Sequence, residues 1–331
     1  MSQRTEIMDI TKRFVKCWEQ ANVSGLDELI LKDVYIDFTI FGRGIDQDQL
    51  KAKMCTRAEN VEYSHFMLMN PIVEADEEHA QETVSMLGTF AGRQNGKYSF
   101  YRFEGMFANS LVRENGKWKL SAIRFELTDE NSTAWPVLSD DGIPQNPGIG
   151  NPKLAADWLS PKHDDRIGWF EGTRTPAVIA EFDAPCYAVP NSTLKKTDEE
   201  QMEETFYRYG LGIDFDCFRL YEDVFTKEAR IVYGDTRPYD KRGDTMFLKA
   251  ERAGSCRCIH TGVFDSIEID GDRATARLHL YGTYVPMGME INPETVRDAW
   301  AWSRYRLEYK KEDGIWKIDQ LNFYSGFVKM N

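Results

Sequence analysis

One sequence pattern occurs twice in this chain, first as Arg113-Glu114-Asn115-Gly116-Lys117-Trp118-Lys119-Leu120 and then as Lys311-Glu312-Asp313-Gly314-Ile315-Trp316-Lys317-Ile318. Each copy centres on an Asn-Gly or Asp-Gly pair. Such a pair is a strong signal for a tight β-hairpin, because both central residues of a type I′ turn need positive φ. The two tryptophans lie 198 residues apart (316 minus 118). The pattern predicts two hairpins of one design, each closing one half of the chain.

Two further signatures repeat in the same order: a Leu-Lys-Ala helical segment, and a histidine that precedes a strand and an acidic turn. They are Leu50-Lys51-Ala52 with Leu248-Lys249-Ala250, and His65 through Asp76 with His260 through Asp270. The separation between partners stays near 195–198 residues throughout. Three signatures in the same order and spacing indicate one structural unit written twice.

Each unit is expected to begin with an amphipathic helix and to continue with a run of antiparallel strands. Apolar residues follow the 3–4 spacing of a buried helical stripe at Ile10, Phe14, Cys17 and Trp18, and again at Met202, Phe206, Tyr209 and Ile213. Helices followed by antiparallel strands are typical of the α+β class. We therefore expect one domain over residues 1–130 and another over 197–331.

Between these domains, residues 131–196 differ in composition. Eight prolines and many glycines occur here together with aromatic residues such as Trp135 and Trp158. Because a free linker is poor in aromatic residues, we expect this connecting segment to pack along the domain surfaces. A short helix is predicted over Leu154 to Trp158.

The overall composition excludes several classes of protein. The net charge of −13 over 331 residues argues against binding to nucleic acid and to anionic membranes, which select for clustered Lys and Arg. No apolar run reaches the ~18 residues of a membrane span, and the N-terminus does not resemble a signal peptide. Cys256 and Cys258 form a lone pair with no second pair to complete a zinc site, so we expect no metal and reduced thiols in the cytoplasm.

The second unit contains three groups suited to proton transfer: the phenol of Tyr209, the carboxylate of Asp214 and the imidazole of His260. A neutral imidazole is a suitable base near neutral pH. A carboxylate that accepts its Nδ1 proton fixes the tautomer and favours the imidazolium once it forms. A tyrosine hydroxyl can polarise a carbonyl or protonate a leaving group.

Each repeated unit resembles the SnoaL-like branch of the NTF2-like superfamily. The features that carry the resemblance are the helix with Arg208-Tyr209 and Asp214-Phe215-Asp216, the His260 segment before Asp270-Gly271, and the hairpin through Asp313-Gly314. The resemblance covers most of residues 200–331 and more loosely 5–130. It implies a cone, in which a curved antiparallel sheet wraps around helices and leaves an apolar pocket at its open end.

The motifs are most similar to the scytalone dehydratase, bile-acid dehydratase and lindane dehydrochlorinase group. This resemblance implies that Asp214 orients His260, that His260 removes a substrate proton, and that Tyr209 is the acid or electrophilic partner. It also implies that no metal and no organic cofactor takes part. Further candidates for the pocket wall are Tyr284, Trp302, Asn322 and Phe264.

Structural explanations stay open for all three residues. His260 is also suited to be a core histidine, Asp214 to cap a helix end, and Tyr209 to pack on the stripe of Phe206. Positions five apart on a helix differ by about 140° in azimuth, so Tyr209 and Asp214 share a pocket only if the helix ends or bends near Asp214. The glycines at 210 and 212 make an irregular helix plausible.

The first unit keeps a histidine, His65, but the alignment gives it neither of the other two groups: Asn22 takes the place of Asp214, and Cys17 the place of Tyr209. Asparagine can hold a histidine but offers no negative charge to the imidazolium. Asp27, Glu28 or Asp37 remain alternatives for that charge. We expect the first unit to be a degenerate or differently tasked copy.

The function that these residues and the family resemblance together imply is a cofactor-independent lyase or isomerase. It would act, in the manner of a dehydratase, on a hydrophobic cyclic or aromatic small molecule. The alternative is a binding protein without chemistry, in which the two cones pair within the chain. Either form is compatible with a homo-oligomer.

Overall fold

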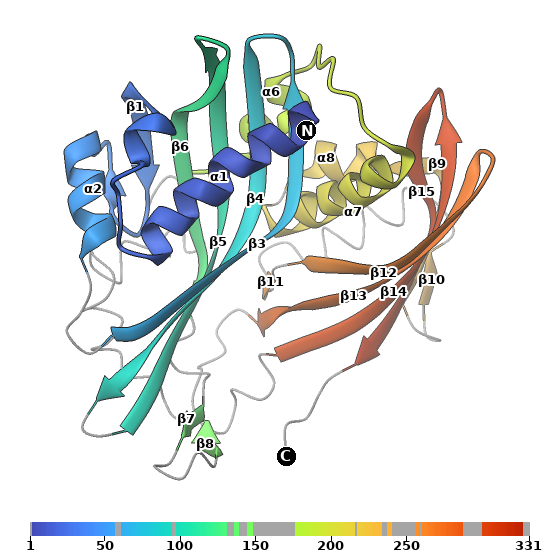
Figure 1. Cartoon of the computed structure of the whole chain (residues 1–331). Helices are drawn as coiled ribbons and strands as arrows, with labels where there is room; N and C mark the ends of the chain where they lie inside the picture. Colours follow the sequence, from blue (N-terminus) through green and yellow to red (C-terminus); the bar gives the residue numbers. More distant parts are fainter. Residues whose placement is uncertain are drawn as a thin grey trace. The chain divides into compact units, whose positions relative to one another are not determined.

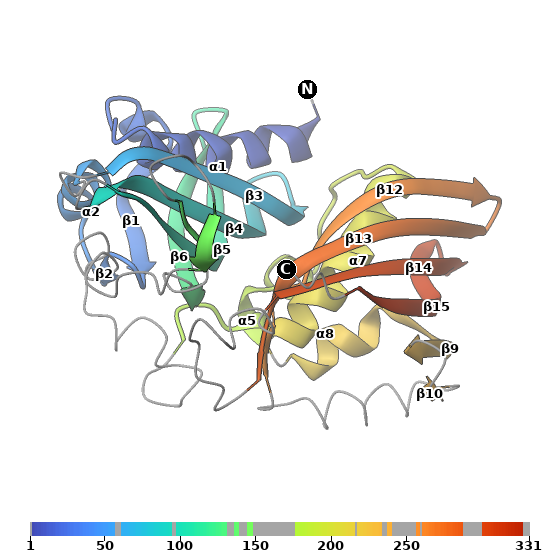
Figure 2. The same ribbon diagram turned by 90° about the horizontal axis from the view of Figure 1, so that it is seen from below.

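A computed structural model describes residues 2–56, 61–94, 97–130, 136–138, 144–147, 176–215, 217–233, 237–239, 256–258, 260–286 and 300–326 (Figure 1). The chain divides into two compact units, and the boundary falls between Leu194 and Lys195. Figure 2 shows that in each unit a long helix lies against one face of a curved sheet. The α+β class predicted from the sequence is confirmed.

The first unit holds α1 (Gln3–Glu19), η1 (Leu26–Glu28), β1 (Ile30–Phe38), β2 (Gly42–Arg43), α2 (Gln47–Cys55), β3 (Val61–Ala75), β4 (His79–Gln94), β5 (Lys97–Glu114) and β6 (Lys117–Glu130). Its sheet has the order β2-β1-β6-β5-β4-β3. Strand β1 is parallel to β6, and the other neighbours are antiparallel. Helix α1 begins where the Ser2 side chain accepts a hydrogen bond from the Thr5 backbone N–H, a usual N-cap.

The second unit holds α7 (Asp198–Asp214), α8 (Phe218–Asp223), β9 (Phe225–Tyr233), β10 (Arg237–Tyr239), β11 (Cys256–Cys258), β12 (Thr261–Asp270), β13 (Arg273–Pro286), β14 (Trp300–Glu312) and β15 (Ile315–Gly326). The strand order is β10-β9-β15-β14-β13-β11, and β12 also pairs with β13. Strand β9 is parallel to β15, as β1 is to β6. Helix α7 begins with a capping box between Thr197 and Glu200.

The two hairpins predicted from the repeated pattern have the predicted backbone. Asn115 and Gly116 have φ of 51° and 79°, and Asp313 and Gly314 have φ of 52° and 80°. The turn after β12 differs, because Asp270 pairs with Arg273 and the loop residues are Gly271 and Asp272. Gly271 has φ of 60°, and Asp272 is not among the residues with positive φ. A glycine at the first loop position is typical of a type II′ turn rather than type I′.

The repeat extends to an irregularity of the sheet. Strands β5 and β6 shift register between Ser110 and Leu111, and β14 and β15 shift register between Glu308 and Tyr309. Each shift is a β-bulge that adds one residue to the last strand of its unit, Ser121 in the first and Asp319 in the second. The bulge therefore reverses which residues of that strand face the helix.

Aromatic side chains dominate the core of the first unit. The ring centroid of Trp18 lies 4.5 Å from Phe66, 5.4 Å from Phe38 and 5.6 Å from Phe103. Phe107 and Phe125 complete this cluster at a centroid distance of 4.6 Å. All five phenylalanines are buried. The space between helix and sheet is therefore filled by packed rings.

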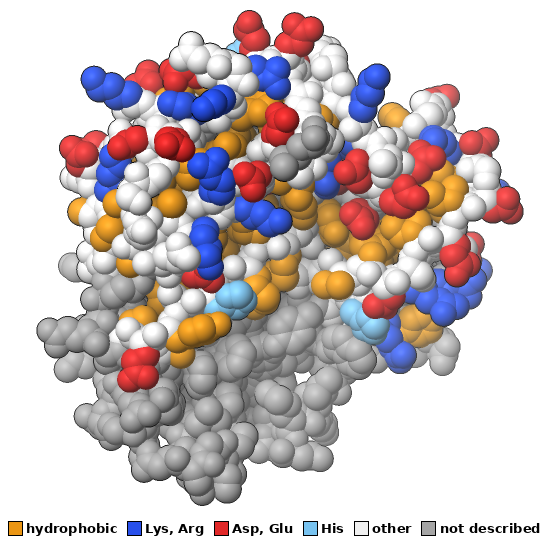
Figure 3. Space-filling model, viewed as in Figure 1, with side chains coloured by type: hydrophobic (Ala, Val, Ile, Leu, Met, Phe, Trp, Pro, Cys, Tyr) orange, Lys and Arg blue, Asp and Glu red, His pale blue; other side chains and the backbone are white. Residues whose placement is uncertain are grey.

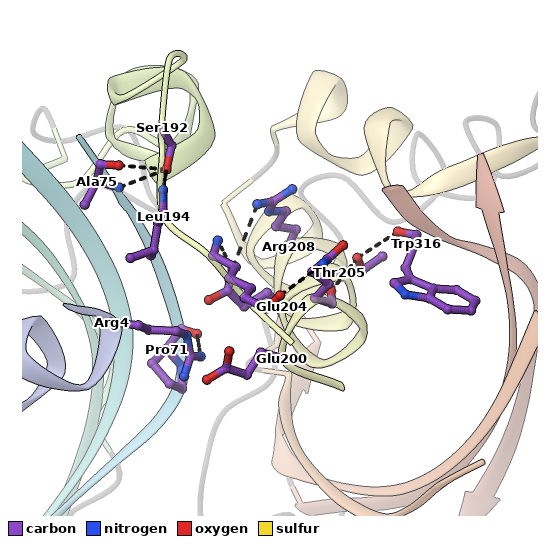
Figure 4. Close-up of polar contacts among 12 residues, drawn as sticks. Arg4, Pro71, Ala75, Ser192, Leu194, Glu200, Glu204, Thr205, Arg208 and Trp316 are labelled. Carbon is purple, nitrogen blue, oxygen red and sulfur yellow. Dashed lines mark hydrogen bonds and ion pairs between the residues drawn. The ribbon is translucent and has the colours of Figure 1, made fainter. Parts of the chain in front are cut away.

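Residues 176–194 cover the outer face of the first unit's sheet, which is the face away from α1. This segment contains α5 (Ala180–Asp183) and α6 (Pro185–Ala188). The hydroxyl of Ser192 binds both the backbone N–H and the backbone carbonyl of Ala75, as Figure 4 shows. Residues 136–138 and 144–147 form a separate two-stranded ladder. The helix predicted at Leu154 to Trp158 lies outside the described residues.

Within the described ranges, no helix is long and apolar enough to cross a membrane. The same ranges contain no group of three or more His, Cys, Asp and Glu side chains placed to hold a metal ion.

Candidate proton-transfer site

The last residue of helix α7 and the residue before β12 form a buried pair. Asp214 Oδ1 lies 2.5 Å from His260 Nδ1, and Asp214 Oδ2 accepts a hydrogen bond of 2.8 Å from the His260 backbone N–H. The side chains are 4% and 3% exposed, respectively. One carboxylate thus fixes both the main chain and the ring of His260.

The hydrogen bond decides which ring nitrogen is basic. A carboxylate is an acceptor, so the Nδ1 atom that faces Asp214 carries the proton. In the neutral ring of His260, Nε2 is therefore the unprotonated, basic nitrogen. When Nε2 takes a proton, the Asp214 carboxylate already stands beside the positive charge that forms.

Gly210 allows the helix to approach His260 closely. A Cβ atom at Gly210 would stand 3.1 Å from the His260 Cβ and 3.3 Å from its carbonyl oxygen, tighter than ordinary contact. Gly210 and Asp214 are four residues apart, so they lie on one face of α7. The sequence suggested that the glycines make the helix irregular. Instead, α7 is helical up to Asp214, and Gly210 serves the contact with His260.

Tyr209 stands beside the imidazole and within the core. Its ring centroid lies 5.7 Å from that of His260 in an edge-to-face arrangement, with an angle of 79° between the rings. It also packs on Phe206, Phe225 and Tyr305 at 5.6 to 6.4 Å and is fully buried. The structure therefore brings Tyr209, Asp214 and His260 together, and Tyr209 is at the same time a core residue.

The four predicted pocket residues have different positions. Phe264 packs edge-to-face on Phe206 and Tyr207 at 5.9 and 6.1 Å. The backbone of Tyr284 pairs with Cys258 and that of Trp302 with Tyr281, but both side chains lie outside the described part of the chain.

The placement of Asn322 in the pocket wall is wrong. Asn322 pairs with the exposed Arg306 and hydrogen-bonds its carbonyl oxygen at 3.3 Å, while its neighbour Leu321 is buried. The bulge at Asp319 is the physical reason. Without it, Asn322 would share the inward face of Trp316 and Ile318, since alternate residues of a strand face the same side.

The first unit contains the same kind of pair, with a partner that the sequence alignment missed. His65 Nδ1 lies 3.0 Å from Glu19 Oε1, which also accepts a 3.0 Å hydrogen bond from the Phe66 backbone N–H. The predicted partner Asn22 instead accepts a hydrogen bond from the Ser24 backbone N–H in a turn. The assignment of Asn22 to the place of Asp214 is therefore wrong.

A constant offset in the numbering identifies Glu19. His260 and His65 are 195 residues apart, and the same offset takes Asp214 to Glu19 (214 minus 195) and Tyr209 to Phe14 (209 minus 195). Helices α1 and α7 both have 17 residues and end at these two acids.

The two pairs differ in exposure. The side chain of His65 is 51% exposed, whereas that of His260 is 3% exposed. Burial raises the pKa of the Glu19 carboxyl, but hydrogen bonds from Lys16, the Phe66 backbone and His65 outweigh it and hold this pKa below its usual value. Glu19 is therefore an anion near neutral pH that binds a histidine at the surface.

A family model described as a SnoaL-like domain matches residues 1–124 and again 195–322. None of the curated proteins matches the sequence.

Several solved structures resemble part of the chain. A hexachlorocyclohexane dehydrochlorinase, LinA-type3, from Novosphingobium barchaimii matches at 14% identity and a TM-score of 0.34, over 39% of this chain and 86% of its own. A protein of unknown function with a cystatin-like fold from Nostoc punctiforme matches at 12% identity and 0.34, over 41% and 98%. An NTF2-like protein from Novosphingobium aromaticivorans matches at 15% identity and 0.32, over 40% and 84%.

Proposed function

This chain belongs to the SnoaL-like domain family, and we propose that its second unit is a cofactor-independent lyase or isomerase that acts on a hydrophobic cyclic or aromatic small molecule. The observation that carries the proposal is the contact of one buried carboxylate, Asp214, with both the Nδ1 and the backbone N–H of His260. This arrangement fixes the tautomer, the ring orientation and the counter-charge that a general base needs.

In the proposed reaction, Nε2 of His260 removes a proton from a carbon of the substrate. The electron pair of the broken C–H bond forms a C=C bond. In a lyase, the neighbouring leaving group departs with its own electron pair and is protonated. In an isomerase, the proton returns at another carbon. Asp214 stabilises the imidazolium in both cases, at a site where burial strengthens the attraction between the two charges.

Tyr209 is proposed as the acid or electrophilic partner. Its ring lies 5.7 Å from that of His260, which supports a shared site. Replacement by phenylalanine keeps the ring and its packing on Phe206, so it tests the hydroxyl alone. If the hydroxyl takes part in the reaction, Tyr209→Phe lowers turnover without loss of stability.

A binding protein without chemistry is the second candidate. The complete burial of Tyr209 and the satisfied, buried His260 favour it, because a core pair of this kind also fastens a helix end to a strand. In that case the two units would hold a ligand without reacting with it. That the two units pair within the chain stays a prediction.

The test is exchange of a substrate proton for deuterium, together with turnover, over a panel of cyclic and aromatic alcohols in D2O. Proton removal by His260 leads to exchange or elimination that His260→Gln abolishes. His279→Gln is the matched control, because His279 is also paired with a carboxylate, Asp265, but is 38% exposed on the outer face. Full activity in His260→Gln would show the assignment to be wrong. Tight binding of a panel member with no exchange would favour the binding protein.

A further inference from the structure

The outer face of the sheet is covered in the first unit and exposed in the second. In the first unit, Thr83, Ser85, Ala108 and Glu126 on this face are buried. Asp183 of the covering segment 176–194 has its carboxylate 3.5 Å from Arg124, and its carbonyl accepts a 3.1 Å hydrogen bond from the side chain of Gln81. A short helical segment with an acidic side chain thus occupies this face.

The matching turns and bulges fix the equivalent positions in the second unit. The first-unit row Thr83–Ala108–Arg124 corresponds to Arg277–Arg306–Asn322, and the row Ser85–Met106–Glu126 corresponds to His279–Arg304–Tyr324. Small or neutral residues in the covered face are therefore replaced by arginine at three positions.

These positions are exposed in the second unit. The side chain of Arg306 is 53% exposed, and Tyr324 and Val263 are 48% and 60% exposed. Arg277 and Arg304 are exposed as well. Figure 3 shows positive side chains and a histidine together on the visible face of the second unit. Val263 and Tyr324 stand at opposite ends of the row that contains His279 and Arg304.

The outer face brings two positive charges next to each other. Arg277 and Arg306 are direct cross-strand partners, and like charges opposite each other destabilise a sheet. Asp265 lies 2.7 Å from His279, and Glu308 lies 3.8 Å from Arg306 and offsets part of its charge. A partner that brings carboxylates to Arg277 and Arg306 would relieve the repulsion.

We propose that this outer face of the second unit docks an acidic helical segment of a partner protein. The arginines would bind its carboxylates, for which the planar guanidinium is well suited. Val263 and Tyr324 would contact its apolar side chains. The first unit supports this occupant, because there the same face binds a helical segment through Asp183.

The test uses a fluorescein-labelled amphipathic helical peptide with Glu on its polar face, and an otherwise identical peptide with Gln at those positions. Fluorescence anisotropy with the full chain is expected to show at least about tenfold tighter binding of the acidic peptide. The double variant Arg277→Thr with Arg306→Ala carries the first unit's residues at these positions, and it should reduce that affinity by about tenfold or more. Lys195→Gln is the control, since Lys195 is exposed in the same unit but precedes α7 and lies outside the sheet, and it should leave the affinity unchanged.

Relief of the repulsion gives a second readout that needs no ligand. The double variant should have a higher Tm than the wild type, because it removes two like charges that face each other. Equal affinity for both peptides, or an affinity that the double variant leaves unchanged, would overturn the proposal. Self-association of the wild type that the double variant abolishes, without binding of the peptide, would assign the face to a second copy and also overturn it.

Discussion

Asp214 and His260 are joined at two points, by the 2.5 Å contact between Oδ1 and Nδ1 and by the 2.8 Å hydrogen bond from the His260 backbone to Oδ2. The first contact determines the chemistry of the ring, and the second ties the end of α7 to the start of β12. The pair therefore serves the stability of the unit and its proposed function together.

Asp214→Ala is expected to lower the free energy of unfolding by about 3 kcal/mol, because it leaves a buried histidine without its acceptor. Urea denaturation measures this change. Asp265→Ala is the matched control: Asp265 pairs with His279, but its side chain is 46% exposed, so its loss should cost under about 1 kcal/mol. Equal effects of the two changes would contradict a structural role of the buried pair.

Asp214→Asn tests the chemical role. The amide has one acceptor oxygen where the carboxylate has two, so it can accept from only one of the two His260 donors. It also cannot offset the charge of the imidazolium, so turnover should fall by about 100-fold or more. Steady-state kinetics on a confirmed substrate measures this. A variant that keeps the wild-type turnover would show that the charge of Asp214 is not needed.

Gly210→Ala should disturb His260, since a Cβ at this position would stand 3.1 Å from the His260 Cβ. In an open helix position the same change is expected to stabilise by up to about 1 kcal/mol. We expect no gain in the free energy of unfolding here, together with a shift of the NMR signal of the His260 Nδ1 proton. Gly25→Ala is the control, because no atom lies within 4 Å of a Cβ at Gly25. An ordinary stabilisation by Gly210→Ala with an unchanged His260 signal would contradict the close contact.

Glu82 makes the stability of the first unit dependent on pH. Burial raises the pKa of its carboxyl from 4.5 to about 7, against the lowering effects of the hydrogen bond from Thr11 and the charge of Arg4. The folded state therefore holds a proton that the unfolded state releases above pH 4.5. The contribution of the Glu82 carboxyl to the free energy of unfolding is fully present below pH 4.5. It is lost as the pH rises toward 7, by about 3 kcal/mol in all.

Glu82→Gln should remove this decline, because the amide does not titrate. Chemical denaturation at a series of pH values between 4 and 8 compares the two proteins. Parallel pH profiles for the wild type and Glu82→Gln would show that Glu82 is not the responsible group.

The pair of the first unit can be tested through the titration of Glu19. His65→Gln removes one of the hydrogen bonds that lower the Glu19 pKa, so this pKa should rise toward 4.5. Carbon NMR of the labelled carboxyl follows it. Asn22→Ala should leave the titration unchanged, because Asn22 bonds within its own turn. A shift on replacing Asn22 and none on replacing His65 would restore the original alignment.

The amino-acid sequence by itself determined the features that depend on neighbours along the chain. The Asn115-Gly116 and Asp313-Gly314 turns follow from the tolerance of these residues for positive φ, and the helix starts follow from caps such as Thr197. The repeat of these local signals was enough to predict two copies of one α+β unit. The family resemblance also predicted that Asp214 orients His260.

Only the tertiary structure decided which residues meet across the sheet and the helix. The bulge at Asp319 turned Asn322 to the outer face, because one added residue reverses the alternation of a strand. Glu19 rather than Asn22 contacts His65. The offset of 195 residues is compatible with Glu19, but the contact itself depends on how α1 packs against β3. Side-chain burial likewise separates the exposed His65 from the buried His260, although both are held by a carboxylate at the end of a 17-residue helix.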